Sequence, residues 1–237
     1  MNTRQVKLVF ISDFACPWCY IGYRHLKAAI QQSKGLNLDF DVEIRPFVLN
    51  TCLPPDCSSR EGHLIKRYGA EKWAAMKAMS VAKAEEAGIT LSLGGPLCDS
   101  ITSHRLMAKA WELNGSAGQD AVAQRLFKAY NEEDLDISDH DVLSDIAEEA
   151  GLMTKESALA FLSTDELLAK VEYQIHEARS KGVMGVPFTV IDGKWAVSGG
   201  QTAPVFVKIF TKLAQLPDPS HESDEGTPTG SPVPPDA

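Results

Sequence analysis

The stretch "DFACPWCYIG", residues 13–22, decides how the rest of the chain is interpreted. It places Cys16 and Cys19 three positions apart, with Pro17 and Trp18 between them. A pair with this spacing is half of a zinc site, a structural disulfide or a redox-active pair. The residues before and after the pair distinguish among these three.

The segments that flank the pair predict a β-α-β unit in the first 50 residues. Residues 6–11 form a short apolar run typical of a buried strand. Residues 40–44 alternate apolar and polar side chains, which predicts a second strand. Between them, apolar side chains recur at helical spacing, and Gly35 follows as a stop signal. The apolar positions of this predicted helix are Cys19, Tyr23, Leu26 and Ile30.

Residues 60–180 contain several helical patterns and no convincing strand. One pattern, "SHRLMAKAWELNG", ends on Gly115. Ser138 precedes "DHDVLSDIAEEAG" and is the expected N-cap of that helix. Thr164 precedes "DELLAKVEYQIHEARSKG", whose acidic Asp165 and Glu166 suit a helix N-terminus.

The end of the chain predicts two strands and a helix. Residues 187–192 and "KWAVSG" flank Asp192-Gly193, a strong hairpin signal, and Pro204 opens a final helical pattern. With the block of helices removed, the order β-α-β, β-β-α remains. The sequence therefore predicts an α/β, thioredoxin-like fold with a large all-helical insertion. The expected boundaries are a discontinuous thioredoxin-like domain at 1–58 and 180–216, a helical insertion domain at 59–179, and a disordered Pro-rich tail at 217–237.

Composition restricts the partners. The net charge of -9 argues against a nucleic acid or an anionic membrane, which both need a basic surface. No apolar run approaches the ~20 residues of a membrane span, and residues 6–12 read as a strand rather than as an export signal. The five cysteines are an odd number and do not form a typical disulfide framework. We therefore expect a cytoplasmic protein.

The position of Cys16 explains how the pair would work. Cys16 falls between a strand and a helix, where the unpaired N–H groups of the first turn favour a thiolate. Cys19 lies one turn along, within reach of the Cys16 sulfur. Asp13 is interpreted either as a proton relay for Cys19 or as a helix-entry residue that contributes a hydrogen bond.

Other cysteines leave alternatives open. Cys52 and Cys57 enclose "LPPD", and together with the first pair they match the spacing of a four-cysteine zinc site. They could also form a second redox pair, or remain two reduced thiols. Cys98 is isolated and expected to be inert. His104 is either a contact for a glutathione-like ligand or an ordinary residue in the first turn of a helix.

Pro187 follows Gly185-Val186 at the head of an interior strand, where proline is normally disfavoured. The "SDFACPWCYIG", "FDVEIRPFVLN", "SHRLMAKA" and "GVMGVPFTVIDGKWAVSGGQ" segments together resemble the DsbA-like thioredoxin family. More narrowly, they resemble its FrnE-type branch, related to kappa-class glutathione transferases and 2-hydroxychromene-2-carboxylate isomerases.

The resemblance implies a role for each residue of the two motifs. Cys16 is the nucleophile and Cys19 the resolving cysteine. Pro187 is a cis-proline beside them, and the backbone of Val186 pairs with an extended substrate. Pro17 and Trp18 flank the nucleophile and are expected to contact the substrate as well.

The function implied is that of a thiol–disulfide oxidoreductase of the DsbA/FrnE type. Its partners would be protein or small-molecule thiols and disulfides, with no bound cofactor and with glutathione as a redox partner or co-substrate. The alternative is a glutathione-dependent isomerase or transferase, but relatives of that kind typically carry serine where Cys16 stands. A zinc-clamped interaction module is the third reading. The motif leaves the direction of electron flow open, because C-x-x-C proteins span a wide range of potentials.

Overall fold

The computed structural model describes residues 3–49 and 59–216. A four-stranded sheet with the order β2-β1-β3-β4 lies at its centre. β1 and β2 are parallel, whereas β3 runs antiparallel to both of its neighbours. The bounds of the strands are Arg4–Ser12 for β1, Leu38–Pro46 for β2, Phe188–Ile191 for β3 and Trp195–Ser198 for β4. The predicted order of strands and the α/β class are confirmed.

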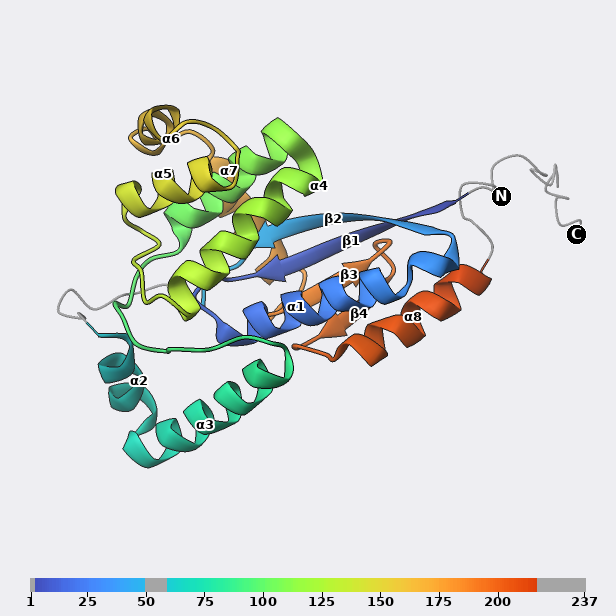
Figure 1. Cartoon of the computed structure of the whole chain (residues 1–237), viewed down its shortest axis with the longest axis horizontal. Helices are drawn as coiled ribbons and strands as arrows, with labels where there is room; N and C mark the ends of the chain where they lie inside the picture. Colours follow the sequence, from blue (N-terminus) through green and yellow to red (C-terminus); the bar gives the residue numbers. More distant parts are fainter. Residues whose placement is uncertain (1–2, 50–58, 217–237) are drawn as a thin grey trace, which may run out of the picture.

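Two helices cover one face of this sheet. α1 (Pro17–Gln32) and α8 (Ala203–Gln215) lie side by side in front of the strands (Figure 1). Val6, Leu8 and Phe10 of β1 point toward them and are buried, because alternate side chains of a strand share one face. A short 3-10 turn, η1 (Lys34–Leu36), returns the chain from α1 to β2.

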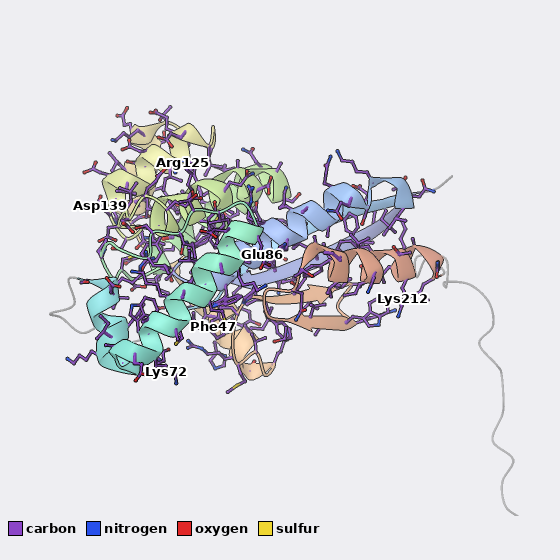
Figure 2. All side chains as sticks on the ribbon, turned by 60° about the horizontal axis from the view of Figure 1, so that its bottom comes forward. Phe47, Lys72, Glu86, Arg125, Asp139 and Lys212 are labelled. Carbon is purple, nitrogen blue, oxygen red and sulfur yellow. The ribbon has the colours of Figure 1, made fainter. Side chains whose placement is uncertain are left out.

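The described part of the chain between β2 and β3 contains helices joined by loops, and no strand. The helices are α2 (Arg60–Tyr68), α3 (Ala70–Glu86), α4 (Ile101–Asn131), α5 (His140–Glu149), α6 (Lys155–Leu162) and α7 (Leu168–Ser180). Figure 1 shows α4 to α7 grouped beyond one end of the sheet, with α2 and α3 on the opposite side of α1. In Figure 2, α3 runs across the molecule with Glu86 near its end beside α1, while Arg125 and Asp139 lie out on the other helical group. The predicted helical insertion is confirmed.

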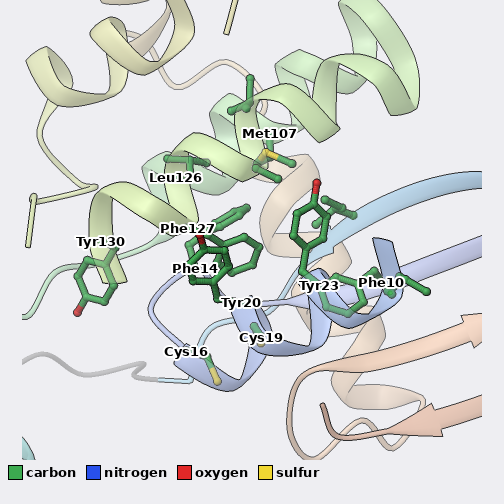
Figure 3. Close-up of a cluster of buried hydrophobic side chains, with 14 of the residues drawn as sticks. Phe10, Phe14, Cys16, Cys19, Tyr20, Tyr23, Met107, Leu126, Phe127 and Tyr130 are labelled. Atoms are coloured by element: carbon green, nitrogen blue, oxygen red, sulfur yellow. The ribbon is translucent and has the colours of Figure 1, made fainter. Parts of the chain in front are cut away.

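A continuous core joins α1 to the insertion. The ring of Phe127, from α4, lies 4.8 Å from Phe14 and is stacked on Tyr20 at 5.2 Å, measured between ring centroids. Tyr23 packs on the same ring at 5.5 Å. Figure 3 shows these aromatic side chains gathered directly behind Cys16 and Cys19. The helix that carries the cysteine pair is therefore held from both sides, by the sheet and by α4.

Two predicted helix starts are wrong. The N-cap of α5 is Asp139 rather than Ser138, because the Asp139 carboxylate accepts the backbone N–H groups of Asp141 and Val142. Ser138 instead donates its hydroxyl to Asp136.

The second correction concerns α7, which begins at Leu168 rather than directly after Thr164. The carbonyl oxygens of Thr164 and Glu166 accept hydrogen bonds from the buried guanidinium of Arg105. Leu167 has a positive φ of 66° and turns the chain into the helix. A tertiary contact thus outweighs the favourable placement of acidic residues in a first turn.

Glycine positions agree with the predicted breaks. Gly115 has a φ of 57° and, with Asn114, interrupts α4, so the predicted helix end is a kink at which a second helical segment begins. Asp192 and Gly193 both have positive φ, as expected for the predicted hairpin between β3 and β4. Within residues 3–49 and 59–216, none of the helices is long and apolar enough to cross a membrane.

Candidate active site

Cys16 is the N-cap residue of α1, with extended backbone angles that end the strand-to-helix turn. Pro17 follows at the first helical position, where its missing N–H costs nothing. The first turn contains no acidic residue, and no side chain caps it. The partial positive charge of the helix N-terminus therefore lies next to Cys16, and no acidic residue of the first turn offsets it. Cys16 is 6% exposed, and Trp18 beside it is half-buried.

Cys19 lies one turn along α1 and is completely buried. Burial raises the pKa of its thiol well above the usual value, and the neighbouring Cys16 raises it further. The backbone N–H of Asp13 donates to the Cys19 sulfur at 3.5 Å and opposes this effect. Both cysteines are free thiols in this structure. The pair thus consists of a nearly buried sulfur at the N-terminus of α1 and a completely buried sulfur whose neutral thiol form is favoured.

The loop before β3 faces the pair. The sulfur of Cys16 lies 3.9 Å from the carbonyl oxygen of Val186, and the Val186–Pro187 peptide bond is cis. Pro187 is buried, and its own carbonyl accepts the backbone N–H of Gly199 at 2.9 Å. The positions that the sequence singles out at the two ends of the insertion, around Cys16 and around Pro187, therefore lie together in space.

Two glycines that the sequence analysis does not single out bring α1 against this loop. A Cβ atom added at Gly22 would lie 2.9 Å from Cγ of Pro187 and 3.2 Å from Cα of Gly200. One added at Gly200 would lie 3.1 Å from the carbonyl oxygen of Trp18. None of these three atoms is the free end of a flexible side chain. The sequence signal that could have indicated this contact is Gly22 itself, because a glycine inside a helical pattern often marks a close approach of another segment.

Replacing Gly22 by alanine tests whether this close approach sets the geometry of the site. Alanine is the better helix former by about 1 kcal/mol, so α1 alone would gain stability. We expect the opposite, a loss of about 1–3 kcal/mol in the free energy of unfolding, because the methyl group overpacks against Pro187. Urea denaturation measures this change. We also expect disulfide-exchange turnover to fall about tenfold, or ~1.4 kcal/mol of barrier.

The matched control is Gly62→Ala in α2, where the nearest atoms to an added Cβ belong to Ser59 at 3.6 Å. This variant should lose neither stability nor turnover. If Gly22→Ala behaves like Gly62→Ala, the contact with Pro187 does not position α1.

Asp13 is buried and uses each carboxylate oxygen for a backbone group. Oδ1 accepts the N–H of Ala15 at 3.0 Å, and Oδ2 accepts the N–H of Leu49 at 2.8 Å. These bonds favour the interpretation of Asp13 as a helix-entry residue that contributes hydrogen bonds. The carboxylate ties the turn before Cys16 to the segment that follows β2.

His104 fits neither sequence-based interpretation well. It lies in the first turn of α4 but is 2% exposed, and its Nε2 is 3.0 Å from the carbonyl oxygen of Phe47. Burial lowers the pKa of this imidazole, although the nearby Asp13 carboxylate acts in the opposite direction. His104 and Asp13 therefore hold the same segment after β2, and His104 has no surface to offer a ligand.

The remaining cysteines lie apart from this site or outside the described residues. Cys98 is buried, and burial raises the pKa of its thiol to about 12, which agrees with an inert residue. Cys52 and Cys57 lie outside the described residues. Within the described ranges, no group of three or more histidine, cysteine or acidic side chains could hold a metal ion. The four-cysteine zinc site needs Cys52 and Cys57 and is tested chemically below.

The sheet, the C-x-x-C pair at the start of α1 and the cis-proline loop facing it define a thioredoxin-like protein. The sequence matches the DSBA-like thioredoxin domain over residues 7–210. The chain belongs to this family. No curated protein matches the sequence.

Solved structures with similar folds include oxidoreductases and an isomerase. A protein described as a probable DsbA oxidoreductase from Streptomyces coelicolor is 25% identical, with a TM-score of 0.76 over 97% of this chain and 100% of its own. Cytosolic disulfide reductase DsbM from Pseudomonas aeruginosa with GSH is 19% identical, with a TM-score of 0.61 over 89% of this chain and 100% of its own.

The fold is also shared with 2-hydroxychromene-2-carboxylate isomerase, at 17% identity and a TM-score of 0.59, over 88% of this chain and 96% of the isomerase. At 19% and 17% identity, the second and third likenesses concern the fold alone. They leave the reaction to be argued from the site.

Proposed function

We propose that the protein is a thiol–disulfide oxidoreductase of the DsbA/FrnE type that cycles Cys16 and Cys19 between dithiol and disulfide. One observation carries the proposal. The Cys16 sulfur lies at the N-terminus of α1 and 3.9 Å from the carbonyl of Val186, so the proposed nucleophile lies next to the backbone of the loop before β3. Family membership and the 25% identical Streptomyces oxidoreductase support the same class of chemistry.

The reaction proceeds in two exchanges. The Cys16 thiolate attacks one sulfur of a substrate disulfide, and the other substrate sulfur leaves as a thiolate. Cys19 then attacks the Cys16 sulfur in this mixed disulfide, its proton passes to the departing substrate thiolate, and a Cys16–Cys19 disulfide remains. The substrate gains two electrons and the protein loses two. Read in reverse, the same steps oxidise a substrate dithiol.

Each neighbouring residue has a role in this scheme. Val186 would align an extended substrate through its backbone, and Pro187 would pack beside the mixed disulfide. Pro17 and half-buried Trp18 would contact the substrate next to the nucleophile. Glutathione is the proposed redox partner, since the structurally similar DsbM was solved with GSH. We propose a cytoplasmic location from the same similarity to a cytosolic reductase.

Replacing Cys19 by serine tests the dithiol cycle. Without the second sulfur, the mixed disulfide on Cys16 has no internal attacker, and we expect its release to slow by at least about tenfold, or ~1.4 kcal/mol of barrier. Intact mass spectrometry after incubation with oxidised glutathione would show one glutathione attached through Cys16. The variant Cys98→Ala, which alters a buried thiol of similar size, should clear the adduct at the original rate.

The Cys19→Ser variant also distinguishes the oxidoreductase from a glutathione-dependent isomerase or transferase. An isomerase or transferase would keep its catalytic turnover in this variant, and that result would contradict the proposal. Metal analysis of the reduced protein addresses the zinc reading. One equivalent of zinc that is lost on replacing Cys16 would also contradict a redox-active pair.

A further inference from the structure

Ser12 is a buried polar residue whose hydroxyl has no evident structural use. It is the last residue of β1 and completely buried. Its backbone carbonyl accepts the N–H of Phe47 at 2.8 Å, but its Oγ has no well-formed hydrogen bond. Buried side-chain hydroxyls nearly always have a partner, so this exception calls for an explanation.

The reactive group that the Ser12 hydroxyl could serve is the sulfur of Cys19. Even-numbered residues of β1 face α1, and Cys19 begins the buried face of that helix. Ser12 directly precedes Asp13, whose backbone N–H donates to the Cys19 sulfur at 3.5 Å, and the Ser12 hydroxyl acts to lower the pKa of that thiol. One of two consecutive residues, Asp13, thus already donates to this buried sulfur, while the hydroxyl of the other, Ser12, has no partner of its own.

A neutral thiol is a weak acceptor, whereas a thiolate is a strong one. During resolution of a mixed disulfide, the Cys19 proton leaves to the departing substrate thiolate, the Cys16–substrate bond breaks and the Cys16–Cys19 bond forms. Negative charge therefore develops on a sulfur that has no access to water. Fixed donors aimed at such a charge stabilise the transition state without having to reorganise.

We propose that Ser12 is a further catalytic residue, whose hydroxyl donates a hydrogen bond to the Cys19 sulfur as that sulfur becomes a thiolate. The inference rests on the proposed dithiol cycle and adds to it the group that makes a buried resolving cysteine reactive. The N–H of Asp13 supplies the second donor to the same sulfur.

Titratable groups near this sulfur come from α1, from the turn before it and from α4. The Cys16 thiol lies on the same helix and raises the pKa of Cys19. The Asp13 carboxylate is engaged by the N–H groups of Ala15 and Leu49, and the imidazole of His104, from α4, lies near it with a pKa lowered by burial. A change at Ser12 leaves these groups in place, so a shift in the titration of Cys19 reports on the hydroxyl.

The chain provides a closely matched control in Ser33. This serine is also buried, 1% exposed, and its Oγ also lacks a hydrogen-bond partner. It caps the other end of α1, about 20 Å from Cys19 at 1.5 Å per residue. Ser33→Ala therefore removes the same atom from the same kind of environment, without affecting the sulfur.

The first test is the titration of Cys19 in protein carrying Cys16→Ser, followed by thiolate absorbance relative to the same protein with Cys19→Ser added. We expect Ser12→Ala to raise the midpoint by about half to one pH unit, equivalent to a three- to tenfold smaller thiolate fraction below the midpoint. Ser33→Ala should leave the midpoint unchanged. An unchanged midpoint in Ser12→Ala, or an equal shift in both variants, would overturn the proposal.

The second test uses protein with both cysteines and follows decay of a Cys16–glutathione disulfide after rapid mixing with oxidised glutathione. Ser12→Ala should slow decay by the same three- to tenfold while the adduct forms at the original rate. A slower formation step instead would mean that Ser12 acts on Cys16. The titration measures no turnover and therefore tests the role of Ser12 separately from the dithiol cycle. An unchanged midpoint would overturn the role of Ser12 and leave the dithiol cycle intact. Loss of the dithiol cycle would instead appear as full activity in a Cys16 variant.

Discussion

Replacing Cys16 by serine is expected to lower the rate of disulfide reduction by at least about a thousandfold, or ~4 kcal/mol of barrier. Serine keeps the shape of the N-cap residue of α1 but does not ionise at neutral pH and cannot form the mixed disulfide. The aromatic core behind the site is held by contacts between rings and not by this sulfur, so the fold should be retained. Insulin reduction with a dithiol reductant measures the turnover, and circular dichroism verifies the fold.

Cys98→Ala is the control for a general effect of losing a thiol. Burial raises the pKa of Cys98 to about 12, so this residue is protonated at neutral pH and unavailable for exchange. We expect its replacement to leave turnover within about threefold, or ~0.7 kcal/mol. Equal turnover in Cys16→Ser and in the unaltered protein would contradict the assignment of the nucleophile.

Arg105→Leu is expected to cost about 3–5 kcal/mol in the free energy of unfolding, since it leaves several buried acceptors unpaired. Arg105 is 5% exposed, and its guanidinium donates to the carbonyl oxygens of Glu166 at 2.9 Å and Thr164. These bonds join α4 to the turn between α6 and α7. Urea denaturation at neutral pH measures the loss.

Arg125→Leu, farther along α4, serves as the comparison. Its guanidinium pairs with Glu133 at 3.1 Å and with Glu149, both on the surface, where an ion pair contributes at most about 1 kcal/mol. We expect a loss within that range. If the two variants are equally stable, the carbonyl oxygens near α7 have other partners and Arg105 does not hold that turn.

The elements of secondary structure that depend on neighbouring residues were predicted correctly from the sequence. The strands around Cys16 and the hairpin at Asp192-Gly193 follow from alternation and turn chemistry, which depend on neighbouring residues only. The break at Gly115 is of the same kind, because a positive φ is a property of that residue's own backbone. The thioredoxin-like order of elements could be read from these signals together.

The errors have a different cause. The start of α7 is set by Arg105, about 60 positions earlier in the chain, and no propensity near Thr164 carries that information. The sequence also shows no sign that His104 is buried, because its environment is made by Phe14 and Phe47 from other segments of the chain. In each case a long-range contact decided the outcome.

The sequence by itself identified the residues of the candidate site, since Cys16, Cys19 and Pro187 are residue types whose reactivity or backbone geometry is local, and their order along the chain matches the motifs of the family. Only the tertiary structure decided how these residues are arranged. The end of β1 meets α1 where the backbone N–H of Asp13 donates to the Cys19 sulfur, and the absence of side chains at Gly22 and Gly200 lets the proline loop reach the helix. These contacts depend on distances between distant segments, which residue spacing does not encode.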